Sequence, residues 1–180
     1  MGRVITKKFL SCVLAFLMIL SIVPMNLVTI LNANAATSGF YVDGTTIRDG
    51  NGNAFVMRGI NMPHEWFPVY TSTSIKAAAE KGANTVRVVC SDGEENYYQG
   101  KTTADELKSI IDTCKKNKVI CVLEVHDTTG KDDVNSLNKA VNYWIEMKSV
   151  LQGNEDYVIV NIANEWYASW NNAQNWADGY

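Results

Sequence analysis

Two kinds of apolar pattern alternate along the chain from about residue 54 onward. Short runs of almost continuous apolar and β-branched residues predict buried strands over residues 54–61, 84–90, 119–125 and 157–163. Between these runs, apolar residues recur every three or four positions and predict helices over residues 74–81, from Thr103 onward, over 134–151 and from 172. This alternation favours an α/β fold in which helices cover a parallel sheet.

Local signals mark the ends of several elements. Thr103 and Glu106 have the spacing of a helix capping box, and the residues that follow place a row of apolar side chains on one helical face. Residues 39–57 instead predict a β-hairpin, with turns at Asp43-Gly44 and over residues 49–52.

Two architectures fit the alternation, a doubly wound sheet and a (β/α)8 barrel. A doubly wound nucleotide-binding protein carries a glycine-rich turn after its first strand. Here residues 61–66 follow that strand and contain no glycine. Thr129-Gly130-Lys131 resembles the end of a phosphate-binding loop, but Val125 stands where that motif needs a glycine. Nucleotide binding is therefore discarded.

The first 35 residues have the layout of a targeting segment. Basic residues come first, and an almost unbroken apolar run follows over residues 9–23. Small residues at Ala33 and Ala35 then match the cleavage site of a secretory signal peptide. We therefore expect residues 1–35 to be removed and residues 36–180 to form the secreted, extracellular chain.

A membrane anchor is the alternative for this segment. The apolar stretch over residues 9–30 would nearly span a bilayer if Pro24 and Asn26 were tolerated inside a helix. The small residues at the proper distance favour cleavage instead. No later segment is apolar enough to cross a bilayer, so no membrane contact is expected after cleavage.

Composition limits the partners of the chain. It is 47% hydrophobic and 19% charged with only 3 Pro, which is typical of a globular domain. The formal net charge is −3, and a mildly acidic surface suits a neutral substrate such as a glycan rather than nucleic acid. Cys90, Cys114 and Cys121 lie at apolar positions without C-x-x-C spacing, so we expect buried free thiols.

Polar and aromatic residues gather where the predicted strands end, which is the face that carries the active site in β/α barrels. Glu165 is the best candidate for chemistry. A carboxyl group beside an aromatic side chain is partly shielded from water, which favours its protonated form and suits a general acid. Asn164 could bind a substrate hydroxyl beside it. Two alternatives stay open on spacing alone: Glu165 is a solvated loop residue, or it is the ion-pair partner of an arginine.

Arg87 interrupts an apolar strand, where a cation needs a carboxylate partner. The partner carboxylate has either a structural or a catalytic role, and the sequence favours the structural one. His126 could orient a hydroxyl or a carboxylate, or could be a structural histidine. Trp66 and Trp166 could stack on sugar rings, with core packing as the alternative. The His, Asp and Glu residues at the strand ends are too scattered to predict a metal site.

Four strand motifs in this order resemble glycoside hydrolase family five, the retaining (β/α)8-barrel enzymes. They are Arg58-Gly59-Ile60-Asn61, Thr85-Val86-Arg87-Val88-Val89, Leu123-Glu124-Val125-His126-Asp127 and Ile162-Ala163-Asn164-Glu165-Trp166. The chain is most similar to bacterial secreted endo-β-1,4-mannanases, from about Gly39 to Tyr180. The resemblance implies strands one to four of a (β/α)8 barrel with their helices, preceded by the N-terminal hairpin.

The resemblance also implies roles for the candidate residues. Glu165 would be the general acid/base, and Asn164 would bind the sugar 2-hydroxyl. Arg87 would help to keep the nucleophile ionised, and His126 would belong to the hydrogen-bond network around the substrate. The remaining candidates for sugar contact are the loop residues His64, Trp66 and Trp166. His64 departs from the family pattern, because Met62 and Pro63 separate it from Asn61.

A retaining glycosidase needs a second carboxyl group as nucleophile, about 5–5.5 Å from the acid/base. The resemblance places it at the end of strand seven, beyond Tyr180. Glu65 lies in the wrong loop for this role, and Glu124 precedes the end of strand three. We therefore expect an inactive N-terminal half of a secreted endo-acting enzyme that cleaves β-1,4-mannan. The alternatives are an endo-β-1,4-glucanase and a non-catalytic glycan-binding half-barrel.

The same resemblance sets expectations for partners and stability. The two-carboxylate mechanism needs no cofactor, the substrate would be a β-1,4-linked polysaccharide, and no obligate protein partner is implied. An open half-barrel is expected to expose the edges of its outer strands and some apolar surface.

Overall fold

A four-stranded parallel sheet is the centre of the fold in this computed structural model, which describes residues 39–95 and 100–166. The spatial order of its strands follows the sequence: β3 (Gly59–Met62), β4 (Thr85–Cys90), β5 (Ile120–Val125) and β6 (Val158–Asn161). In a doubly wound sheet the strand order reverses at a switch point. The unreversed order among these four strands is that of part of a β/α barrel.

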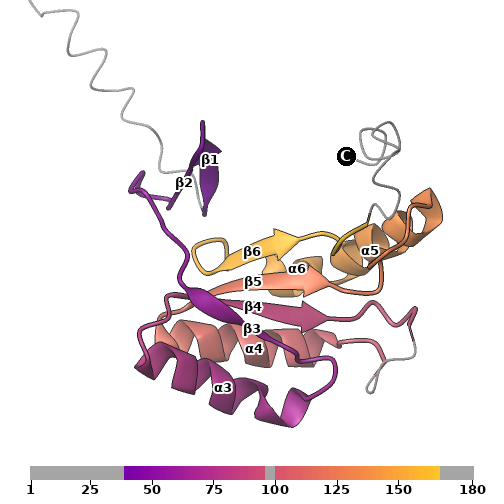
Figure 1. The fold of residues 1–180 in the computed structure, drawn as a ribbon, viewed down its shortest axis with the longest axis horizontal. Helices are drawn as coiled ribbons and strands as arrows, with labels where there is room; N and C mark the ends of the chain where they lie inside the picture. The colour runs from indigo at the N-terminus through magenta and orange to yellow at the C-terminus, as the bar shows by residue number, and fades with distance from the viewer. Residues whose placement is uncertain (1–38, 96–99, 167–180) are drawn as a thin grey trace, which may run out of the picture. The chain divides into compact units, whose positions relative to one another are not determined.

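The described helices connect these strands and cover one face of the sheet (Figure 1). They are α3 (Pro68–Glu80), α4 (Ala104–Asn117), α5 (Val134–Glu146) and the short α6 (Lys148–Leu151). Parallel neighbours need such crossovers, because a tight turn cannot return the chain to the start of the next strand. Before the sheet, β1 (Tyr41–Asp43) pairs antiparallel with β2 (Thr46–Arg48), which confirms the predicted hairpin.

Element boundaries follow local chemistry, and they lie within two residues of prediction except in three elements. The Thr103–Glu106 capping box starts α4 as expected. Helix α3 starts six residues early because Pro68 at its first turn already has a helical φ. The expected long helix divides into α5 and α6 at Met147. The expected strand over 54–61 is wrong in its first half, where Ala54 bridges to Arg48 instead.

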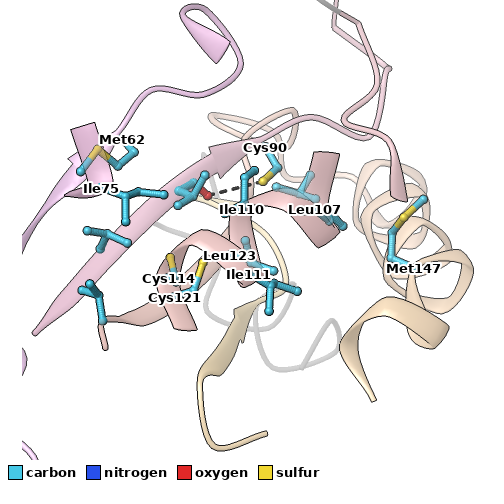
Figure 2. Packing of buried hydrophobic residues seen from close by; sticks show 14 of the residues in the cluster. Met62, Ile75, Cys90, Leu107, Ile110, Ile111, Cys114, Cys121, Leu123 and Met147 are labelled. Carbon is cyan, nitrogen blue, oxygen red and sulfur yellow. Dashed lines mark hydrogen bonds between the residues drawn. The ribbon is translucent and has the colours of Figure 1, made fainter. Parts of the chain in front are cut away.

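The hydrophobic core lies between the sheet and the helices (Figure 2). Fully buried side chains alternate along the two central strands and meet the apolar face of α4; they include Val86, Val88, Cys90, Cys121, Leu123, Val125, Leu107 and Ile111. Cys90, Cys114 and Cys121 are buried and free, as predicted. Because successive strand residues point to opposite faces, Arg87 and Glu124 lie on the face away from the helices.

The two outer strands leave apolar side chains exposed, as expected for the edges of a partial barrel. Ile60 of β3 is 56% exposed, and Ile162, just after β6, is 51% exposed. Over residues 39–95 and 100–166, no helix has both the length and the apolar character to span a bilayer. The predicted signal peptide and the helix expected from residue 172 lie outside the described residues.

Gly59 fills a position that no other residue can occupy without a shift of the backbone. A Cβ atom there would lie 1.6 Å from the carbonyl oxygen of Thr85 on the neighbouring strand. We expect Gly59→Ala to lower the free energy of unfolding by about 3 kcal/mol, the upper range for overpacking, in a denaturant titration. Gly44→Ala is the control, because Gly44 has a φ of +58° but open space around it, so it should cost about 1 kcal/mol.

Candidate active site

Four polar side chains meet on the open face of the sheet, toward the carboxyl ends of its strands. Glu124 is completely buried and lies between two partners. Its Oε1 accepts a hydrogen bond from His126 Nδ1 at 2.7 Å, and its Oε2 lies 3.1 Å from Arg87 Nη2. The carboxylate partner that the sequence requires for Arg87 is therefore Glu124. Burial raises the pKa of Glu124, and the hydrogen bond from His126 and the charge of Arg87 oppose that rise.

Asn164 joins this cluster from the segment after β6. Arg87 Nη2 donates to Asn164 Oδ1 at 2.6 Å, and Asn164 Nδ2 donates to Thr129 Oγ1 at 2.8 Å. Thr129 in turn donates from its hydroxyl to the His126 carbonyl. The backbone N–H of Asn164 donates to the Val125 carbonyl, so both the main chain and the side chain of Asn164 are fixed.

Glu165 follows Asn164 with a strained backbone. Its φ is +40°, a left-handed conformation that costs a non-glycine residue free energy and that clusters at functional sites. The Gly130 N–H donates to its carbonyl, and Thr128 donates to the neighbouring Asn164 carbonyl. The side chain of Glu165 is exposed, so the partial shielding expected from the sequence is not provided by the described residues.

The aromatic and histidine candidates are divided between the cluster and other sites. Trp66 packs edge-on against His126, with ring centroids 5.3 Å apart. Trp166 is 7% exposed, and its Nε1 donates to the Asp133 carbonyl, a packing role. His64 is buried with its Nδ1 2.9 Å from the Thr71 hydroxyl on α3, and burial lowers its pKa. Of the two histidines, His126 joins the Arg87 cluster through its hydrogen bond to Glu124, whereas His64 contacts Thr71. A sugar-binding role for these residues stays a prediction.

Sequence reasoning missed Glu124 and Thr129 as members of the cluster. From the sequence, Glu124 is a candidate only for the nucleophile, and its position before the end of strand three excludes that role. The available signal is alternation, because Glu124 lies two residues before His126 and shares its sheet face, and Arg87 stands at an alternating position of the neighbouring strand, offset by two residues from the register partner of Glu124. The hydroxyl of Thr129 carries no comparable pattern in the sequence.

Two acidic side chains, Asp92 and Asp127, lie together at the same end of the sheet. Asp127 is buried and accepts hydrogen bonds from the Ser91 hydroxyl and from the backbone N–H groups of Asp92 and Glu95. Burial first, and the charge of Asp127 second, raise the pKa of Asp92 to about 6. Over the described residues, no group of three or more His, Cys, Asp or Glu side chains is arranged to hold a metal ion.

Asp92→Asn should change the pH dependence of stability. An acid whose folded pKa lies above its unfolded value of about 4 stabilises the fold when protonated and loses that contribution as the pH rises. The wild-type free energy of unfolding should therefore fall between about pH 4 and pH 6 relative to the variant, with the folded pKa as the upper limit. Denaturant titrations of both proteins at intervals across this window measure the difference. A wild-type curve parallel to that of Asp92→Asn would contradict the assignment.

This partial barrel, with its polar cluster at the carboxyl ends of the strands, has the architecture of the β/α-barrel enzymes. The family model of the cellulases, glycosyl hydrolase family 5, matches residues 48–179. The chain therefore belongs to glycosyl hydrolase family 5.

Relatives and solved structures agree with this assignment. A mannan endo-1,4-beta-mannosidase of Salipaludibacillus agaradhaerens is 54% identical over 143 residues, covering 79% of this chain and 45% of the relative. One of Cellvibrio japonicus is 45% identical over 148 residues, covering 81% of this chain and 34% of that protein. The structure of a mannohexaose complex of Thermomonospora fusca beta-mannanase is similar with a TM-score of 0.71 and 42% identity, covering 79% of this chain and 48% of that one. The chain spans less than half the length of these proteins.

Proposed function

We propose that the full-length protein carrying this chain is a secreted, endo-acting, retaining glycoside hydrolase of β-1,4-mannan. The observation that carries the proposal is the placement of Asn164 and Glu165 just after β6, with Asn164 tied through Arg87 to a buried carboxylate. The similarity to mannan endo-1,4-beta-mannosidases, at up to 54% identity, supports mannan as the substrate. The mannohexaose complex of a similar protein supports a site that accepts a linear chain of sugars.

In this proposal Glu165 is the general acid/base. It donates a proton to the departing glycosidic oxygen and then accepts one from the attacking water. Its exposed side chain, on a backbone held by Gly130, leaves it accessible to a substrate. The nucleophilic carboxylate would come from the part of the barrel that relatives have and this chain does not span, so the 180-residue polypeptide by itself would be inactive.

Arg87, Asn164, His126 and Trp66 would form the sugar-binding floor beside Glu165. Asn164 has its carbonyl oxygen turned to Arg87 and one amide N–H to Thr129, which directs the second N–H of the same amide as a donor for a sugar hydroxyl. Trp66 offers an aromatic surface that is partly exposed. His64 and Trp166 are retained as predicted contacts, although both have structural partners here.

A substrate panel tests the proposal. The full-length protein is incubated with soluble β-1,4-mannan and β-1,4-glucan, and reducing ends and product lengths are followed. We expect mannan to be cleaved at least tenfold faster, with mixed oligosaccharides from the first minutes, as for internal cleavage. Equal or faster cleavage of glucan would indicate an endoglucanase. Retention on mannan without cleavage would indicate the glycan-binding alternative.

Secretion is proposed from residues 1–35, with cleavage after Ala35. We expect the protein recovered from the culture medium of a producing bacterium to begin at Ala36, as read by mass spectrometry of its N-terminal peptide. A product that stays in the membrane fraction and keeps residues 9–30 would support the anchor instead.

A further inference from the structure

We propose that Glu124 is a positioning residue that fixes both the amide of Asn164 and the proton of His126. It is not itself assigned to sugar contact, and it acts through its two neighbours, Arg87 and His126, which belong to the sugar-binding floor. The inference rests on the proposed function for its catalytic consequence, but the arrangement itself is a property of the described residues.

The first step is the contact between Glu124 and Arg87. The carboxylate has no exposed surface, and the guanidinium is the cation within ion-pair distance of its Oε2, at 3.1 Å. Burying a charged carboxylate without a partner strongly destabilises a fold. The carboxylate of Glu124 therefore depends on Arg87 staying beside it. Arg87 is thereby held against the sheet rather than extended toward solvent, as a long exposed arginine would be.

The second step passes from Arg87 to Asn164. The same Nη2 nitrogen that faces Glu124 donates to Asn164 Oδ1 at 2.6 Å. If the amide were flipped, its NH2 group would face the guanidinium N–H groups, and two donors would meet. The arginine therefore selects one of the two orientations of Asn164, and the bond to Thr129 supports the same choice.

The third step concerns the other carboxylate oxygen. Oε1 lies 2.7 Å from His126 Nδ1, and a carboxylate only accepts, so the Nδ1 nitrogen carries the proton. In the neutral imidazole, Nε2 is then the acceptor. One buried carboxylate thus makes Asn164 a donor and His126 an acceptor toward the site, two complementary partners for the hydroxyls of a sugar.

Glu124→Gln separates this role from simple packing because it keeps the shape and removes one acceptor. The charged Arg87 is expected to retain the amide oxygen, which turns the amide NH2 toward His126. His126 must then accept at Nδ1 and carry its proton on Nε2, so the tautomer is reversed. We expect kcat/KM on mannan to fall about 10- to 100-fold, by analogy with the loss when a hydrogen-bond partner that orients a metal-ligating histidine is removed.

The experiment is nitrogen-15 NMR of the imidazole ring in the full-length protein, with the His126 signals assigned from a His126→Gln sample. Wild type should show a protonated Nδ1 and an unprotonated Nε2, and Glu124→Gln should show the reverse or a mixture. Glu95→Gln is the matched control, because it removes the same charge from an ion pair with Lys131 at the same end of the sheet. It should leave the tautomer unchanged and activity within twofold.

Several outcomes would overturn the proposal. The first is a wild-type protein in which His126 carries its proton on Nε2. This result needs no variant, so it can be obtained even if Glu124→Gln fails to fold. A folded Glu124→Gln protein with the wild-type tautomer and wild-type kcat/KM overturns the proposal as well. If wild type shows the expected tautomer but cleaves no mannan, the proposed function fails and the positioning role of Glu124 stands.

Discussion

Replacing Glu165 by glutamine is expected to reduce hydrolysis of β-1,4-mannan by the full-length protein about 1,000-fold. Glutamine keeps the size and hydrogen-bonding shape of the side chain but cannot donate a proton to the departing oxygen. A positioned acid/base contributes roughly 100- to 10,000-fold to such a step. Initial rates of reducing-end formation, measured with wild type and variant at equal concentration, give the ratio.

The binding of substrate should survive this change. Glu165 is exposed, and its backbone bond to Gly130 does not involve the side chain, so the fold and the sugar-binding floor are left in place. We therefore expect the variant to retain mannan in affinity electrophoresis as wild type does. Glu80→Gln, at the exposed end of α3, is the control and should keep full activity. An active Glu165→Gln protein would remove Glu165 from the mechanism.

Replacing Arg87 by methionine is expected to have the second largest effect, on both stability and activity. The side chain of Glu124 is 0% exposed, and without Arg87 its charge would be buried with a single partner, His126. Breaking one side of a buried pair typically costs about 3 to 5 kcal/mol, because a charge is left uncompensated. Since Arg87 is itself 27% exposed, we expect the lower value, about 3 kcal/mol, in a denaturant titration at pH 7.

A double variant separates the lost charge from lost packing. Arg87→Met together with Glu124→Gln leaves no charge at the centre of the cluster, so it should recover at least half of the stability lost in Arg87→Met alone. Activity should not recover, since Asn164 is free to flip in both proteins. If the double variant loses as much free energy of unfolding as the two single variants together, the pair is held by packing and not by charge.

The centre of the sheet is well predicted from the sequence because β4 and β5 are buried on both faces or nearly so. Runs such as Thr85 to Cys90 are too apolar and β-branched to be anything else, and four of them separated by helices leave few topologies. The ends of helices and strands are harder to predict from the sequence where tertiary contacts decide them. Residues 54–58 look like a continuation of β3, but their partners lie in β2 and in the side chain of Asn84.

The candidate site was predictable only in part, for the same reason. Glu165 and Asn164 stand out because polar residues interrupt an apolar pattern at a strand end. The pairing of Arg87 with Glu124 depends on the register of two strands, Arg87 with Val122 and Val89 with Glu124, which no single segment encodes. The structural partners of His64 and Trp166 likewise lie 7 and 33 residues away along the chain.

The most direct measurement of the central claim is azide rescue of a Glu165→Ala variant on an aryl β-mannobioside with a good leaving group. Such a leaving group departs without a proton, so a covalent glycosyl-enzyme forms and accumulates when no base activates water. Azide needs no base and attacks the anomeric carbon, releasing the nucleophilic carboxylate. The account predicts faster turnover with azide and a β-linked glycosyl azide as product. No acceleration, or an α-linked azide, would contradict it.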